Sequence, residues 1–196
     1  MVSSEGVTIV PIADAAWPDV QQVFGTRGDP ARCWCQFFKL SNQQWWDEPT
    51  EAKEALLHEQ AAEGTGPGLI AYLDGEPVGW CAIEPRRNYP QALRSKVVTT
   101  ASTERADDSS VWAITCFVVR TGFRRRGVAT ALVAAAVDWA RQHDARLIEG
   151  YPVDTAAREK TSAAALYHGS VSLFESAGFT LAARPTPGRA LMRLEC

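Results

Sequence analysis

The spacing of apolar residues changes most sharply in the middle of this chain. Residues 111–119 form an apolar run, VWAITCFVV, whose length and β-branched and aromatic content are typical of a strand buried on both faces. Residues 120–127 are polar and contain two glycines. Beyond them the apolar residues follow helical spacing, at Leu132, Val133, Ala136, Val137 and Ala140. The pattern therefore predicts a buried strand, a loop and a helix over 128–142.

Shorter elements are predicted on both sides of this unit. Asp74-Gly75 between two apolar runs favours a tight hairpin. Residues 85–110 are predicted to be a long connection, of the kind that often serves as a functional lid. No linker divides the chain, so we expect a single α/β (α+β) domain over 1–196. The other strands are expected over 7–12, 69–73, 77–83, 146–153, 179–183 and 190–194, and the other helices over 15–24, 49–62 and 170–177.

The loop before the central helix has a composition that suits an anion. Arg124, Arg125 and Arg126 supply charged donors, while Gly127 and Ala129 leave room for a ligand near the main chain. A helix N-terminus adds unpaired N–H groups and a partial positive charge. An anion such as a pyrophosphate would fit there. The alternative is a solvated arginine turn before an ordinary surface helix.

Two motifs resemble those of the GNAT acetyltransferase superfamily. Arg124-x-x-Gly127-x-Ala129, after the strand CFVV, is similar to the acetyl-CoA signature [QR]-x-x-G-x-[GA] of that family. Residues 173–179, LFESAGF, are similar to the family ending L-Y-E-K-x-G-F. The resemblance covers residues 76–196 and implies a central mixed, mostly antiparallel sheet flanked by helices. It also implies a cofactor-binding core over 69–196 and an acceptor-side part over 1–68.

The resemblance implies an enzyme that uses acetyl-CoA as cosubstrate and transfers the acetyl group directly to a primary amine of a small molecule. Main-chain groups of residues 117–119 would bond the pantetheine arm, and N–H groups of residues 125–130 would hold the pyrophosphate. The implied cofactor-binding residues are Phe117, Val118, Val119, Arg124, Arg125, Arg126, Gly127, Val128, Ala129 and Thr130.

The chain departs from the family pattern at both expected proton-transfer positions. Phe174 stands where many members have a tyrosine that protonates the leaving thiolate, so Tyr167 is predicted to supply this hydroxyl. Ala113 stands where members often have a carboxylate early in the central strand. Glu84, at the end of a neighbouring strand, is therefore the predicted base. The alternatives to Glu84 are Glu149, Tyr151 and a chain of water molecules.

An aromatic cluster near the N-terminus falls where the family usually shapes the acceptor pocket. Trp34 and Trp46 are predicted to contact the acceptor, and the alternative is that they pack in the core. Cys33-Trp34-Cys35 could begin a zinc site, but a second cysteine pair is lacking, so no metal is predicted. An acidic stretch, residues 104–108, would attract a cationic acceptor unless it is only a solvated face.

Composition limits the classes of partner. The 196-residue chain has a formal net charge of -3, which argues against nucleic acid as the main partner. No apolar run approaches the roughly 20 residues that span a bilayer, and no signal peptide is recognisable. Five cysteines, an odd number, fit reduced thiols, so a cytoplasmic protein without membrane contact is expected.

Two other functions stay open at this point. Acetylation of a protein or peptide amine would require an open groove at the acceptor side. A non-catalytic acyl-CoA-binding regulatory module would account for the missing tyrosine and the missing strand carboxylate. The sequence leaves the acceptor and the oligomeric state open, and a homodimer is one of the options.

Overall fold

The computed structural model describes residues 6–155 and 163–196. Its centre is a seven-stranded mixed sheet with the order β1-β2-β3-β4-β5-β7-β6. Only the β4–β5 pair is parallel in this sheet, and the other pairs are antiparallel. The strands are β1 (Val7–Pro11), β2 (Gly68–Leu73), β3 (Glu76–Pro85), β4 (Val111–Val119), β5 (Leu147–Gly150), β6 (Thr180–Thr186) and β7 (Arg189–Glu195). This confirms the predicted central mixed, mostly antiparallel sheet.

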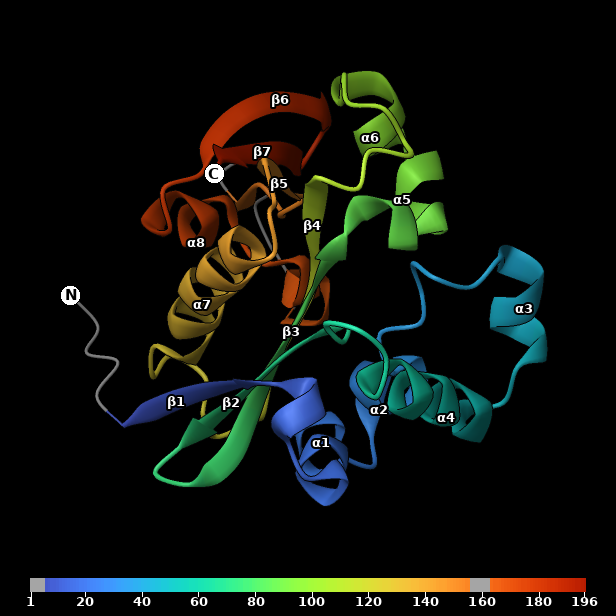
Figure 1. Ribbon diagram of the computed structural model, residues 1–196, viewed down its shortest axis with the longest axis vertical. Helices are drawn as coiled ribbons and strands as arrows, with labels where there is room; N and C mark the ends of the chain where they lie inside the picture. Colours follow the sequence, from blue (N-terminus) through green and yellow to red (C-terminus); the bar gives the residue numbers. More distant parts are fainter. Residues whose placement is uncertain (1–5, 156–162) are drawn as a thin grey trace.

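Helices cover both faces of the sheet (Figure 1). Helices α7 and α8 lie on one side, and the helices between β1 and β4 lie on the other. The α-helices are α1 (Trp17–Phe24), α2 (Gly28–Cys33), α3 (Asn42–Asp47), α4 (Thr50–Ala61), α5 (Pro90–Arg94), α6 (Lys96–Ala101), α7 (Val128–Gln142) and α8 (Val171–Ser176). Short 3-10 helices are η1 (Ile12–Asp14), η2 (Arg86–Asn88) and η4 (Ala163–His168).

The central strand β4 is buried on both faces, as its apolar run predicts. Ile114 and Phe117 belong to the core under α7, whereas Cys116 and Val118 belong to the core under α1 and α4. The sheet and α7 approach closely at Gly79, where a Cβ would lie 2.8 Å from Val128 Cγ1. A larger residue at that position would push the N-terminus of α7 away from the sheet.

A bulge interrupts β4 at Thr115. Ala82 pairs with Cys116 and Ile83 pairs with Ile114, so the register between β3 and β4 skips Thr115. An extra residue in one strand bends it and increases its twist. The bulge lies directly after the last residue of β4 that pairs with β5, which is Ile114. It therefore marks the place where the sheet begins to open.

Several local predictions are confirmed by backbone geometry. Asp74 and Gly75 both have positive φ, 52° and 80°, as the tight hairpin turn requires. Ser170 caps α8, because its Oγ accepts a hydrogen bond of 3.2 Å from the N–H of Leu173. Helix α7 spans residues 128–142, in agreement with its apolar spacing.

Residues 85–110 form the predicted long connection between β3 and β4, but this connection contains η2, α5 and α6, which were not predicted. Short helices of five or six residues contain too few apolar positions to show a helical period. Their formation therefore depends on tertiary packing, which the sequence pattern does not reveal. The same reason explains why α2 and α3 were not predicted. In the described residues, 6–155 and 163–196, no helix is both long enough and apolar enough to cross a membrane.

Candidate active site

Strands β4 and β5 separate halfway along β4. Their pairing runs from Val111 to Ile114 on β4 and ends at Gly150 on β5. The chain then leaves the sheet, and Val153 forms isolated bridges with Ser170 and Arg189. Among the described residues, β4 has no strand partner on its β5 side beyond Ile114, so main-chain groups between Thr115 and Val119 are available to another hydrogen-bonding group.

The open strand leads directly into the loop and α7. Gly127 is the residue before α7 and has φ 81°, a left-handed conformation that favours glycine. In the described part of the chain, no side chain caps this helix. The first N–H groups of α7 therefore keep their hydrogen-bonding capacity for a ligand. Because α7 has 15 residues, the field of its aligned peptide dipoles adds to the attraction of an anion.

The arginines of the loop divide into two groups. Arg120 is held within the protein, because its guanidinium donates 2.9 Å and 2.6 Å hydrogen bonds to Glu76 and to the carbonyl of Pro77. Arg124 is exposed, and its Nε donates a 3.2 Å hydrogen bond to the carbonyl of Val119. Arg125 and Arg126 are also exposed. The loop thus presents three guanidinium groups at the surface, next to the helix N-terminus.

A cleft of about 280 Å³ is lined in part by His168, whose ring contacts the main chain of β4 at Thr115. Its walls come from the segment after α2, from α5 and α6, from the end of β5, from η4 and from β7. Most of the lining side chains are aromatic or small and apolar, and a single arginine is among them. The lining residues are Phe37, Phe38, Ala92, Ser95, Val97, Tyr151, Tyr167, His168 and Arg189.

His168 joins this cleft to β4. Its side chain is 3% exposed, and Nδ1 lies 2.9 Å from the carbonyl oxygen of Thr115, the bulged residue. The ring contacts those of Tyr167 and Phe38, at centroid distances of 3.9 Å and 5.4 Å. Burial, and to a lesser degree the Arg189 guanidinium, lowers the pKa of His168 well below its usual 6.5. Sequence reasoning missed His168, because a lone histidine carries no spacing signal.

Of the two predicted proton-transfer residues, the cleft contains Tyr167. It is 38% exposed, and burial raises the pKa of its hydroxyl above the usual 10, so the phenol is protonated at neutral pH. Glu84 does not line the cleft in the described structure. It is 8% exposed at the end of β3, where its carboxylate pairs with Lys39 at 2.5 Å and accepts a 3.2 Å hydrogen bond from Asn88.

The two predicted acceptor contacts lie in different environments. Trp34 is 4% exposed and stacks on Phe24 with a centroid distance of 4.8 Å. Trp46 is 82% exposed on α3. The structure does not bring these two rings together, and neither is among the described residues that line the cleft. Phe37 and Phe38, from the same aromatic cluster, do line it.

The position of Phe174 accounts for the absence of a tyrosine there. Its ring is fully buried and packs edge-on against Phe117 and Phe179, at centroid distances of 6.0 Å and 5.0 Å. It also fills the space beside Gly150, where even a Cβ would collide with the ring. A hydroxyl at this position would have to be accommodated in an apolar core.

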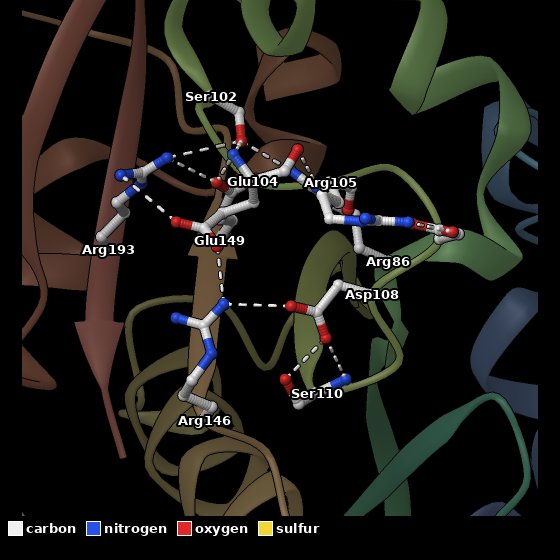
Figure 2. Close-up of polar contacts among 10 residues, drawn as sticks. Arg86, Ser102, Glu104, Arg105, Asp108, Ser110, Arg146, Glu149 and Arg193 are labelled. Carbon is white, nitrogen blue, oxygen red and sulfur yellow. Dashed lines mark hydrogen bonds and ion pairs between the residues drawn. The ribbon is translucent and has the colours of Figure 1, made fainter.

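A buried polar network is centred on the carboxylate of Glu149 (Figure 2). The carboxylate of Glu149 is fully buried and accepts hydrogen bonds from Arg86 at 2.9 Å, Ser102 at 2.7 Å and Arg193 at 3.1 Å. The hydroxyl of Tyr151, a lining residue, donates to the same carboxylate at 3.0 Å. Burial raises the pKa of Tyr151 well above 10, so this donor keeps its proton.

The acidic stretch after α6 is engaged in ion pairs. Arg146 contacts Glu104 at 2.6 Å and Asp108 at 3.1 Å, as Figure 2 shows. Asp107 pairs with Arg105 at 3.0 Å. These ion pairs leave less negative charge for a cationic acceptor, and the expectation that the stretch attracts one stays a prediction. Their role in the fold is to fasten the segment between α6 and β4.

Cysteine chemistry is suppressed in the core. Burial raises the pKa of Cys33 to about 12, and burial raises the pKa values of Cys35 and Cys81 well above their usual range. The sulfur of Cys35 accepts a 2.9 Å hydrogen bond from the indole of Trp80. These thiols stay protonated and are not nucleophiles. Within residues 6–155 and 163–196, no group of three or more potential ligands is arranged to hold a metal ion.

Comparisons with known proteins agree with this geometry. The profile of the Acetyltransferase (GNAT) family matches residues 33–179. Among curated proteins, none matches the chain by sequence. A GCN5-related N-acetyltransferase from Kribbella flavida is a structural neighbour, with 20% identity, a TM-score of 0.57 and coverage of 99% of this chain and 100% of its own.

Two further solved structures share the fold. One is yncA from Salmonella typhimurium with its cofactor acetyl-CoA, at 13% identity, a TM-score of 0.54 and coverage of 97% of this chain and 94% of its own. The other is a ribosomal-protein-alanine N-acetyltransferase from Brucella melitensis, at 13% identity, a TM-score of 0.54 and coverage of 97% and 99%. With the profile spanning most of its length, the chain belongs to the GNAT family of acetyl-CoA-dependent N-acetyltransferases.

Proposed function

We propose that this enzyme acetylates the primary amine of a small molecule held in the cleft beside β4. The observation that carries the proposal is the size and lining of that cleft. Its volume of about 280 Å³ suits a small ligand, and its aromatic walls suit an acceptor with an apolar body. The five free cysteines fit an enzyme of the reducing cytoplasm.

Acetyl-CoA is proposed to occupy the other side of the open strand. Residues 117–119 would bond the pantetheine arm along the edge that β5 leaves free, and N–H groups of residues 125–130 would hold the pyrophosphate. The fit is supported by the uncapped start of α7 and by the left-handed Gly127, whose lack of a side chain keeps the helix entrance clear. The exposed Arg124, Arg125 and Arg126 would add charge-assisted hydrogen bonds to the phosphates.

The reaction is proposed to be direct transfer. The amine nitrogen attacks the thioester carbonyl carbon, a C–N bond forms, the C–S bond breaks, and the electron pair leaves on sulfur. Tyr167 is suited to protonate the sulfur, because it lines the cleft and its hydroxyl is protonated at neutral pH. Much of the rate enhancement in such a reaction comes from holding both reactants in line.

A peptide N-terminus is the second candidate acceptor. The Brucella melitensis neighbour is a ribosomal-protein-alanine N-acetyltransferase, and its fold is shared along nearly the whole chain. A cleft of this size accommodates one terminal residue with a small side chain. A peptide acceptor would therefore leave most of its length outside, against the surface formed by α3 and α5.

The proposal is tested by calorimetric titration of acetyl-CoA into the wild type and into Gly127→Trp. An indole at the start of α7 should block the phosphates, and the loss of two charge-assisted hydrogen bonds weakens binding by about 100-fold or more. Gly122→Ala is the matched control, since Gly122 lies in the same loop with φ 96° and nothing within 4 Å of its would-be Cβ. No acetyl-CoA binding by the wild type would refute the proposal.

The acceptor is then sought by release of free CoA thiol. The panel contains aromatic and aliphatic amines, amino acids, amino sugars, polyamines and alanine-starting peptides. Small amines should outperform peptides in kcat/KM. Turnover confined to peptides would select the second candidate, and acetyl-CoA binding without turnover of any amine would favour the regulatory module.

A further inference from the structure

The imidazole of His168 is fixed in one tautomer by the main chain. Its Nδ1 lies 2.9 Å from the carbonyl oxygen of Thr115. A carbonyl oxygen only accepts hydrogen bonds, so Nδ1 carries the hydrogen, and in the neutral ring Nε2 carries the lone pair. The nitrogen that is left for a ligand in the cleft is therefore a proton acceptor.

The position of Thr115 determines where this acceptor lies. Thr115 is the bulged residue of β4 and the first residue after the pairing with β5 ends at Ile114. His168 is thus anchored at the inner end of the open edge, and its ring also lines the cleft. In the proposed function the thioester lies along this edge and the amine enters from the cleft, so His168 stands where the two meet.

We propose that Nε2 of His168 is the general base that takes the proton from the attacking amine. The inference rests on the proposed function and deepens it, because it assigns the general base. The sequence had predicted Glu84 for this role. Glu84 does not line the cleft in the described structure, and its carboxylate is already paired with Lys39. His168 has the geometry of a base that is oriented by a second group, here the Thr115 carbonyl.

The proton balance closes with residues of the same helix. Attack forms the C–N bond, and the N–H proton passes to Nε2. The C–S bond then breaks, and the Tyr167 hydroxyl protonates the departing sulfur. The imidazolium returns its proton to Tyr167, whose ring centroid lies 3.9 Å from that of His168. The products are the amide and the CoA thiol, and both side chains end in their starting states.

The surroundings of His168 fit this role. Among the described residues, the charged and titratable groups that line the cleft together with His168 are Arg189 from β7, Tyr151 after β5 and its neighbour Tyr167. Burial and Arg189 keep the ring neutral, which preserves the lone pair. A weak base suffices, because the amine N–H becomes strongly acidic as the nitrogen gains positive charge during attack. The resulting imidazolium gives up its proton readily, as the cycle requires.

The tautomer is tested by long-range ¹H–¹⁵N NMR on protein labelled with ¹⁵N-histidine. The chain has only three histidines, His58, His143 and His168, so His168→Asn assigns the signals. At pH 7 we expect His168 with a protonated Nδ1 and an unprotonated Nε2. A ring protonated on Nε2, or an imidazolium at this pH, would overturn the proposal without any need for an acceptor.

Turnover supplies the second test, with the fastest amine of the panel as the probe. His168→Asn keeps an amide N–H near the position of Nδ1, and thus the donor to Thr115, but has no lone pair at the position of Nε2. We expect kcat to fall about 100-fold or more, with the Kd for acetyl-CoA unchanged. The loss should shrink from pH 7 to pH 9, whereas a purely structural defect would be the same at every pH.

His143→Asn is the matched control. Its Nδ1 also contacts a main-chain carbonyl, that of Trp139 at 2.7 Å, but it lies at the end of α7 and is not a lining residue of the cleft. It should leave kcat unchanged. If the wild type fails to bind acetyl-CoA, the proposed function is wrong. If it binds and His168→Asn turns over normally, only the assignment of the base is wrong.

Discussion

The two sides of the active site are built in different ways. The proposed cofactor side is one continuous segment, residues 115–130, which contains the second half of β4, the loop and the first turn of α7. The cleft is assembled from six segments between Phe37 and Arg189, and few of its residues are neighbours in sequence. A continuous site leaves a motif in the sequence, because spacing along the chain determines its geometry. An assembled site depends on the whole fold.

The two sides also differ in how charge is used. The loop exposes Arg124, Arg125 and Arg126 to solvent, where they can meet phosphates. The cleft is lined mostly by neutral side chains, with Arg189 as the charged residue among those described, and the charges behind it are buried and paired through Glu149. Disrupting the buried pairs should therefore damage the cleft and the fold, whereas changes in the loop should affect the cofactor alone.

The largest effect is expected from Arg86→Met. Arg86 is 1% exposed, and its loss leaves the fully buried Glu149 carboxylate without its shortest ion pair. Removal of one partner of a buried pair costs about 3–5 kcal/mol in the free energy of unfolding. Urea denaturation measures this loss. The control is Arg105→Met, since Arg105 pairs with Asp107 at an exposed site, and its urea midpoint should not move.

The next largest effect, on the KM for the acceptor, tests whether the acceptor binds in the cleft or against the tryptophans predicted from the sequence. Phe38→Ala removes a lining ring that packs near His168, so we expect the KM for the best amine to rise about tenfold at an unchanged Kd for acetyl-CoA. Trp46→Ala tests the sequence prediction in parallel. If steady-state kinetics show a larger rise in KM for Trp46→Ala than for Phe38→Ala, the acceptor lies against α3 instead.

How far the sequence could lead is clear from Gly127 and His168. The position of Gly127 just before a helix was predicted, because the strand before it and the helix after it are both evident from apolar spacing. The structure places Gly127 at the start of α7. The role proposed for His168 could not be predicted from sequence. It depends on the end of the β4–β5 pairing and on the contact between η4 and the main chain of β4 at Thr115. Trp34 shows the converse, since the density of aromatic residues did not distinguish the buried cluster from the cleft wall.

A smaller effect, on the pH dependence of stability, is expected from the burial of His168. The folded ring has its pKa lowered well below 6.5, whereas the unfolded chain takes up a proton near pH 6.5. The unfolded state therefore binds more protons below this pH, and stability falls as the pH falls, by up to about 1.4 kcal/mol per pH unit. Above pH 6.5 this contribution is constant.

Urea unfolding at pH 5, 6 and 7.5 checks this linkage. His168→Asn should flatten the slope relative to the wild type, and His143→Asn should retain it. Because the comparison is a difference between two proteins, the titration of the carboxylates cancels. Parallel curves for the wild type and His168→Asn would show that the imidazole titrates normally in the folded state.

The smallest effect on turnover is expected from Glu84→Gln, which separates the two candidate bases. The substitution neutralises the partner of Lys39, which keeps its 2.8 Å hydrogen bond to Gln60. If His168 takes the proton, kcat falls far less than the roughly 100-fold typical of a lost general base, and the pH profile keeps its shape. A loss of kcat that is greater at pH 7 than at pH 9 would return the role to Glu84, and the base would then be predictable from the strand pattern alone.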